Sequence, residues 1–102
     1  MNSLKNESTD RLFATIADLK TAEECADFFG DLCTIKEIQD MAQRLETAIL
    51  LNNHENYQAI SAKVGVSSAT ISRVNRCLNY GTGGYKAVID KMSGGQKDEN
   101  KR

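Results

Sequence analysis

The segment from residue 57 to residue 78, YQAISAKVGVSSATISRVNRCL, constrains the fold more than any other part of the chain. Its apolar residues recur around a central Gly65 at the spacing by which two short helices bury one shared wedge. These residues are Ile60, Val64, Val66, Ile71 and Val74. Gly65 can adopt the positive φ of a residue that follows a helix, and Ser67 can cap the next helix. The segment therefore predicts a helix-turn-helix whose second helix starts near Ser68.

The outward face of this second helix suits the DNA major groove. It is short and hydroxylic at its N-terminal end and cationic further along, over Ser68, Ala69, Thr70, Ser72, Arg73 and Arg76. Short side chains let a helix N-terminus enter the groove, while guanidinium groups reach guanine edges or phosphates. The segment contains no acid, whereas a merely solvated helix surface usually carries Glu and Lys pairs. The pattern predicts double-stranded DNA as a partner.

Residues of such an interface divide into those that read bases and those that hold phosphates. Base edges should be faced by Ser68, Ala69 and Ser72, with Thr70 at the flank. Phosphates should be held by Gln58, Lys63 and Arg76. The complete predicted set is Gln58, Lys63, Ser67, Ser68, Ala69, Thr70, Ser72, Arg73 and Arg76.

A different class of function fits the same pattern. Two helices joined by a glycine turn also form an ordinary αα-corner, which could be the docking element of a helical protein–protein interaction adaptor. The two hypotheses differ in their dependence on salt, because neutralising phosphates makes log affinity fall steeply with log salt.

The charge of the chain is divided between its two parts. The formal net charge is -1 overall, which by itself does not favour a nucleic-acid binder. Before Tyr57, five lysines and arginines stand against eleven acids, whereas from Tyr57 onward eight stand against three. The basic part contains the predicted helix-turn-helix, so the asymmetry orients one face towards a polyanion.

Length and composition bound the fold class. At 102 residues without proline or tryptophan, the chain is predicted to form a single all-α domain over residues 1–92. A flexible polar tail is expected at 93–102. Because no apolar run could span a bilayer and no signal peptide is present, a cytoplasmic protein is expected.

The sequence gives no sign of a metal site, a cofactor or catalytic chemistry. Cys25, Cys33 and Cys77 lack the spacing of a disulfide framework or a zinc site. His54 is the only histidine and falls in a polar loop, which offers no basis for a catalytic triad. Neither a metal nor a cofactor is expected, and the protein is not expected to be an enzyme.

Two short helices are predicted at the N-terminus, at about 8–19 and 22–30. Thr21 and Glu24 form a capping box that opens the second helix, and Gly30 should end it. These helices carry all three phenylalanines, more apolar surface than one short neighbour can cover. We expect them to pack against a second subunit.

A long central helix and a last helix complete the predicted elements. Thr34 and Glu37 form a capping box that opens the long helix, and Asn56 can cap the first helix of the helix-turn-helix. The last helix is expected at 85–92. The apolar set expected to bury against a second copy of the chain is Phe13, Ile16, Phe28, Phe29, Ile38, Leu45 and Ile49.

With these elements in place, the chain resembles the tryptophan repressor superfamily. The run Ala69-Thr70-Ile71-Ser72-Arg73 is similar to the Ala-Thr-Ile-Thr-Arg run that opens the family's recognition helix. The segment from Asn75 to Tyr85 resembles the YerC/YecD-type branch of that superfamily. The resemblance covers most of residues 8–92 and implies a six-helix fold in an intertwined homodimer. Its function would be that of a transcriptional regulator, a repressor, on a palindromic operator.

The resemblance also implies an effector pocket beside the recognition helix. In the tryptophan repressor a ligand lies between a threonine at the start of the long helix and two arginines, and Thr34, Arg44 and Arg73 match these groups. However, Val74 replaces a glycine that leaves room for the indole, and Cys77 stands near a family serine. Forcing a ligand against a β-branched side chain would cost roughly 1–3 kcal/mol. L-tryptophan is therefore not expected to bind in the family's manner, and a different small effector is left open.

Overall fold

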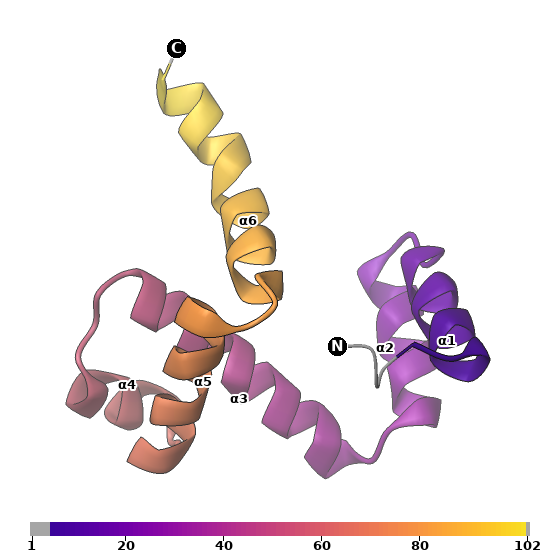
Figure 1. The fold of residues 1–102 in the computed structure, drawn as a ribbon, viewed down its shortest axis with the longest axis horizontal. Helices are drawn as coiled ribbons and strands as arrows, with labels where there is room; N and C mark the ends of the chain where they lie inside the picture. The colour runs from indigo at the N-terminus through magenta and orange to yellow at the C-terminus, as the bar shows by residue number, and fades with distance from the viewer. Residues whose placement is uncertain (1–4, 102) are drawn as a thin grey trace. The chain divides into compact units, whose positions relative to one another are not determined.

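The computed structural model describes the backbone of residues 5–101 and the side chains of residues 5–93. Within this range there are six helices and no strand (Figure 1), which confirms the all-α prediction for the described residues. The helices are α1 (Glu7–Ala17), α2 (Ala22–Leu32), α3 (Ile35–Asn52), α4 (Tyr57–Val64), α5 (Ser68–Tyr80) and α6 (Gly84–Lys101). The contacts within one chain divide into two compact units, residues 1–38 and 39–102, where the sequence predicted one domain for 1–92.

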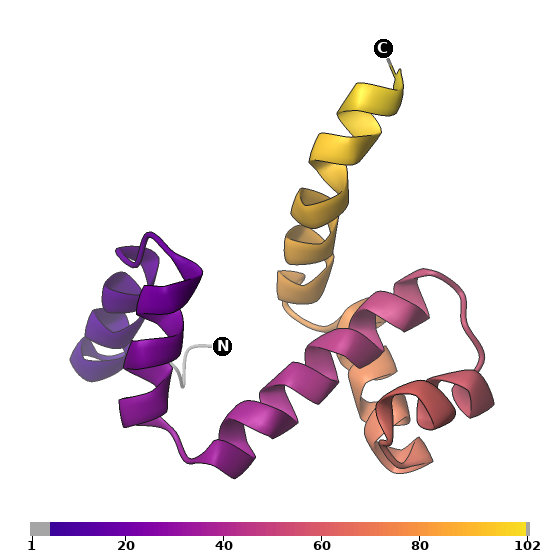
Figure 2. The same cartoon turned by 180° about the vertical axis from the view of Figure 1, so that it is seen from behind.

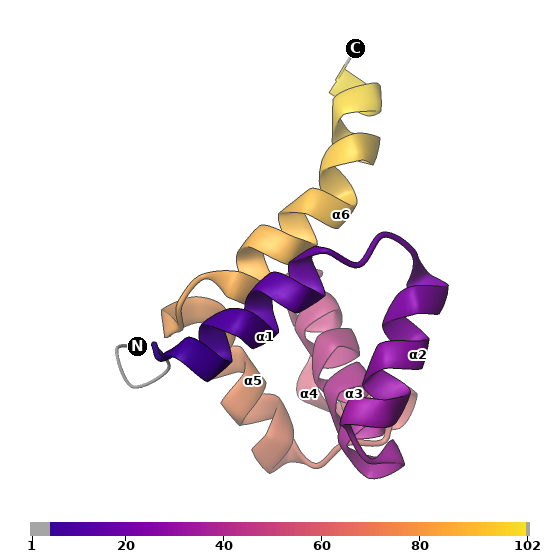
Figure 3. The same cartoon turned by 90° about the vertical axis from the view of Figure 1, so that its right-hand side faces the viewer.

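The N-terminal unit is built around α1 and α2, which are joined by residues 18–21 (Figure 3). Asn6 caps α1, since its Oδ1 accepts from the Thr9 N–H at 2.9 Å. Thr21 caps α2 as predicted and accepts from the Glu24 N–H at 3.0 Å. The prediction that Gly30 ends this helix is wrong. Helix α2 continues through Gly30 to Leu32, because a glycine stops a helix only where the chain takes a left-handed turn after it.

Neither helix of this unit has a buried residue within the single chain. The rings of Phe28 and Phe29 pack edge to face with their centroids 5.8 Å apart, and both side chains are half-buried. Phe13 keeps 54% of its surface exposed and Leu32 keeps 50%. This unit therefore presents apolar side chains to its surroundings.

The C-terminal unit contains two buried clusters, which contact different parts of α5. The first consists of Ile60, Val66 and Ile71, with Leu50, Leu51 and Val64 packed against it. The second consists of Ala48, Val74, Leu78 and Ile89, with Ile49, Leu51 and Tyr85 packed against it. The first cluster holds the turn between α4 and α5, and the second joins α3, α5 and α6 (Figure 2).

The sequence predicted a single wedge that included Val74, and this detail is wrong. Val74 lies three residues beyond Ile71, and in the tertiary structure it packs against Ala48 of α3 and Ile89 of α6 instead of against α4. Helix α3 reaches both clusters through Leu51. The long helix is thus the central support of this unit.

Helix α6 follows α5 after a short glycine-rich connection and is longer than predicted. Gly81 ends α5, with its N–H donating to the Cys77 carbonyl at 2.9 Å, and Gly83 adopts a positive φ of 93°. The helix then runs from Gly84 to Lys101, through the region where a polar tail was expected. No proline interrupts this stretch. The side chains of residues 94–102 lie outside the described part of the chain, so the flexibility of the tail stays a prediction.

Candidate nucleic-acid interface

The turn between α4 and α5 has the predicted geometry. Gly65 lies in the left-handed region at φ 86°, and its N–H donates to the Ser61 carbonyl at 2.9 Å. Ser67 caps α5 by accepting from the Thr70 N–H at 3.2 Å. Ser61 adds a bond that the sequence did not indicate, because its hydroxyl donates to the Val66 carbonyl across the turn at 2.9 Å. Hydrogen bonds from residues before and after Gly65 therefore hold the start of α5 in place.

The predicted interface residues lie on the surface around this turn. Eight of the nine are exposed, and Thr70 is half-buried. The exposed residues are Gln58, Lys63, Ser67, Ser68, Ala69, Ser72, Arg73 and Arg76. Ile71 and Val74 are buried on the opposite side of α5 and anchor it. The hydroxylic and cationic face is thus presented outward on a helix that is packed from behind.

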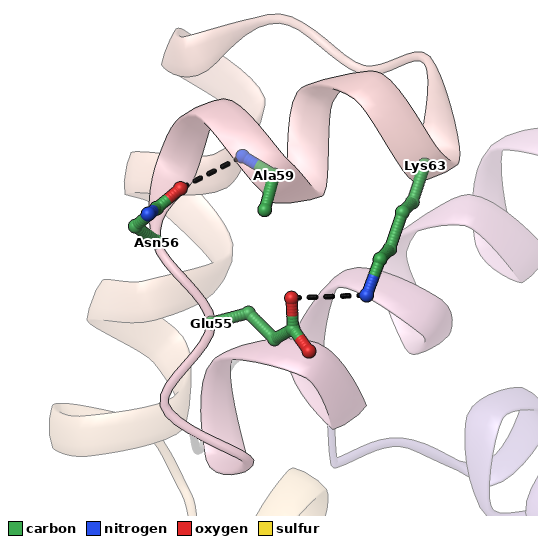
Figure 4. A network of polar contacts seen from close by, with 4 residues as sticks. All are labelled: Glu55, Asn56, Ala59 and Lys63. Atoms are coloured by element: carbon green, nitrogen blue, oxygen red, sulfur yellow. Dashed lines mark hydrogen bonds and ion pairs between the residues drawn. The ribbon is translucent and has the colours of Figure 1, made fainter.

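The three cations of this segment differ in their surroundings. In the described residues neither Arg73 nor Arg76 forms an ion pair, so both guanidinium groups are available to an anion. Lys63 instead has an internal partner, since its Nζ lies 3.0 Å from Oε1 of Glu55 (Figure 4). Sequence reasoning missed this pair because Glu55 lies in the loop before α4, outside the i,i+4 register of a helix.

The loop before α4 also provides the predicted cap. Asn56 Oδ1 accepts from the Ala59 N–H at 2.8 Å, next to the Glu55–Lys63 pair (Figure 4). His54 in the same loop is exposed and has a φ of 66°, which is uncommon for a residue other than glycine. Gln58 is exposed in the first turn of α4.

Four of the five predicted effector-pocket residues belong to the C-terminal unit. Arg44 and Cys77 are exposed, as is Arg73, and all three act electrostatically on the phenol of Tyr85. Val74 is only 1% exposed and packs in the same cluster as Tyr85. The fifth residue, Thr34, lies in the N-terminal unit. Its hydroxyl accepts from the Glu37 N–H at 3.1 Å and caps α3.

Tyr85 is the residue of this region that sequence reasoning missed. Burial raises the pKa of its phenol above the ordinary 10.0, an effect strengthened by Cys77 and opposed by the nearby charges of Arg44 and Arg73. A cavity of about 540 Å³ lies beside it, lined by Leu45, Cys77, Gly81, Thr82, Gly84, Tyr85 and Val88. Nothing in the periodicity of residues 85–92 distinguished Tyr85 from the other residues of this segment.

Two other classes of site are not found in the described chain. Among residues 5–93, no group of histidine, cysteine and acidic side chains is arranged to hold a metal ion. No described helix is both long enough and apolar enough to cross a bilayer.

Comparison with known proteins decides the family. The sequence profile described as Trp repressor protein matches residues 7–93, nearly the whole described chain. The chain belongs to the Trp repressor family. It is 49% identical over 92 residues to the uncharacterized protein YerC of Bacillus subtilis strain 168, an alignment that covers 90% of this chain and 88% of that protein.

Solved structures agree with this assignment to the Trp repressor family. A TrpR-like protein from Eubacterium eligens ATCC 27750 superposes with a TM-score of 0.88 at 48% identity, covering 90% of this chain and 95% of that one. A provisionally assigned Trp repressor from Staphylococcus aureus has a TM-score of 0.86 at 42% identity, covering 89% and 91%. The predicted Trp-repressor-like fold is confirmed. The Trp repressor family is one of DNA-binding regulators, not of enzymes.

Proposed function

We propose that the protein is a homodimeric, cytoplasmic transcriptional regulator that binds double-stranded DNA sequence-specifically and acts as a repressor on a palindromic operator. The observation that carries this proposal is the face of α5. Its exposed hydroxyl groups and unpaired guanidinium groups stand on a helix whose other side is buried in two apolar clusters. A rigid, acid-free helix with small residues at its N-terminal end matches what the major groove admits.

The proposal of a homodimer rests on the N-terminal unit. Its helices bury nothing within one chain, and further apolar side chains are exposed at the start of α3, where Ile35 keeps 75% of its surface accessible. A second copy of the chain would cover such a surface. Two-fold symmetry would then place the two recognition helices about 34 Å apart, one turn of DNA.

Selection of bound duplexes from a random library, followed by titration at two salt concentrations, tests the DNA-binding function. We expect one enriched, palindromic sequence and a steep fall of log affinity with log salt, because each phosphate contact releases counterions. The absence of an enriched sequence, or a flat dependence on salt, would instead favour the protein–protein adaptor with its αα-corner.

Two substitutions on α5 separate base reading from phosphate binding. Ser72→Ala should change the preferred base at one position of the site, at a cost of roughly 1–3 kcal/mol if Ser72 makes a good base contact. Arg76→Ala should weaken all sequences alike and reduce the salt slope by about one. A uniform loss in both variants would contradict these roles.

Lys63 is proposed as a phosphate contact that must first leave Glu55. The exposed pair contributes only up to about 1 kcal/mol, so a phosphate can replace the carboxylate. Glu55→Gln should therefore tighten DNA binding modestly, while Lys63→Gln should weaken it and lower the salt slope. If both variants bind DNA like the original protein, Lys63 pairs only with Glu55 and makes no phosphate contact.

We further propose that L-tryptophan is not the corepressor. Val74 is buried in the cluster that joins α3, α5 and α6, so a ligand lodged against Val74 in the family's manner would have to displace packed side chains. Calorimetry with L-tryptophan tests this proposal. A stoichiometric micromolar site that Arg44→Ala abolishes would overturn it, and would place an effector among Thr34, Arg44, Arg73, Val74 and Cys77.

A further inference from the structure

We propose that Tyr85 of α6 is a positioning residue for the recognition helix, so that a side chain of the protein itself holds α5 in its DNA-binding orientation. The inference rests on the proposed function of α5 and names the side chain that holds this helix in its orientation. It also assigns a role to a side chain in which sequence reasoning found no signal.

The packing of Tyr85 connects three helices. Its half-buried ring lies against the cluster formed by Val74 and Leu78 of α5, Ala48 of α3 and Ile89 of α6. An aromatic ring is large and has few rotatable bonds, so it transmits the position of one helix to its neighbours. Because Val74 and Leu78 lie one turn apart on the inner side of α5, the ring restrains rotation and sliding of that helix against α3.

The positive charges of Arg44 and Arg73 act on the phenol of Tyr85 and oppose the rise of its pKa that burial causes. Arg44 belongs to α3 and Arg73 to α5, so both helices that pack near Tyr85 carry one of these charges. Arg73 follows Ser72 directly on the outward face of α5. Val74, in the cluster against which the Tyr85 ring packs, follows Arg73 directly. A shift of the ring would therefore also displace the neighbouring residues of α5 that are proposed to read bases.

The space beside the ring makes this position sensitive to truncation. The cavity of about 540 Å³ shares Tyr85 with Leu45 of α3, Cys77 of α5 and Val88 of α6. Removing the ring would enlarge it, and the helices around it would lose the group that separates them. Helix α5 could then shift while the turn at Gly65, held by the other cluster, stays folded.

The experiment compares specific with non-specific DNA affinity in the full-length protein. Tyr85→Ala removes the ring, Tyr85→Phe keeps it, and Tyr80→Ala is the matched control because Tyr80, near the end of α5, is 86% exposed. Each variant is titrated with the duplex selected from the random library and with a scrambled duplex of equal length. Circular dichroism reports the folded fraction in the same buffer.

We expect Tyr85→Ala to lose about tenfold or more in affinity for the selected duplex, the worth of about one base contact, with little change for the scrambled duplex. A helix that is folded but displaced keeps its phosphate contacts and loses its base contacts. Tyr85→Phe should stay close to the original protein, as should Tyr80→Ala. A variant that merely folded less would lose both affinities in the same proportion.

Three results would overturn the inference: equal losses for both duplexes, a Tyr85→Phe variant as weak as Tyr85→Ala, or a Tyr85→Ala variant that binds like Tyr80→Ala. If Tyr85→Ala does not fold, Tyr85→Leu takes its place with the same expected selectivity. If the original protein binds no duplex in a salt-dependent way, the proposed function of α5 fails, and that result is separate from these three.

Discussion

The two units of this chain differ in how far they bury their apolar side chains. The C-terminal unit buries Ile60, Ile71 and Val74 almost completely within a single chain. In the N-terminal unit, which carries all three phenylalanines, helices α1 and α2 bury none of their residues. Short helices can therefore have well-formed caps and still lack, within one chain, the packing that stabilises them. The difference indicates that the C-terminal unit has its own core, whereas the helices of the N-terminal unit do not bury their apolar side chains within one chain.

The largest expected effect comes from placing a charge on the N-terminal unit. Phe13→Asp should break the proposed homodimer, because a carboxylate buried without a partner costs several kcal/mol and would occur twice across a two-fold axis. We expect dimerisation to weaken by about a thousandfold or more, roughly 4 kcal/mol. Sedimentation at micromolar concentration measures the change. Arg11→Gln is the control, since it alters the net charge equally on the other side of α1. Unaltered sedimentation of Phe13→Asp would mean that this surface is free in solution.

Two glycine substitutions compare the units directly. A Cβ added at Gly81 would collide with the Cys77 carbonyl, so Gly81→Ala should cost about 1–3 kcal/mol of unfolding free energy. A Cβ added at Gly30 has no atom within 4 Å, and Gly30→Ala should gain about 0.5–1 kcal/mol in the interior of α2. Urea unfolding at a fixed protein concentration gives both values. A loss for Gly30→Ala would instead place a partner's atoms beside that glycine.

A smaller effect is expected at the turn of the helix-turn-helix. Ser61→Ala removes the hydroxyl that bonds to the Val66 carbonyl and should cost about 1 kcal/mol. Ser72→Ala is the matched control, because no hydrogen bond of the Ser72 side chain is found in the described residues and alanine favours a helix. Thermal unfolding monitored by circular dichroism should rank the two variants in this order. If Ser61→Ala were neutral, Gly65 and Ser67 alone would determine the turn.

The smallest expected effect is a pH dependence that belongs to the C-terminal unit. Burial raises the pKa of Tyr85 in the folded protein above its ordinary 10.0. As the pH rises, this phenol therefore loses its proton in the unfolded chain before it does so in the folded protein. The contribution of Tyr85 to the free energy of unfolding should be fully present below about pH 10 and should be lost as the pH rises above it. Tyr85→Phe should remove this contribution. Urea midpoints of both proteins between pH 9 and about 11 test the prediction, and parallel curves would refute it.

Local signals were sufficient wherever one residue serves its own neighbours. Asn56, Ser67 and Thr34 cap helices as predicted, because a cap needs only a short polar side chain and the next free N–H groups. Gly65 has the expected positive φ for the same reason. Gly30 shows the limit of this reasoning, since nothing in the sequence next to a glycine states whether the chain turns there or continues as a helix.

The sequence by itself thus determined the helical class, the turn at Gly65, the capped helix starts and the chemical character of the outward face of α5. Each of these depends on residues within about one or two helical turns of one another. Only the tertiary structure decided that Val74 packs with α3 and α6, that Lys63 pairs with Glu55, and that Tyr85 packs against the cluster that joins α3, α5 and α6. These contacts join side chains from different elements, and their geometry follows from how the helices pack, which no spacing along the chain records.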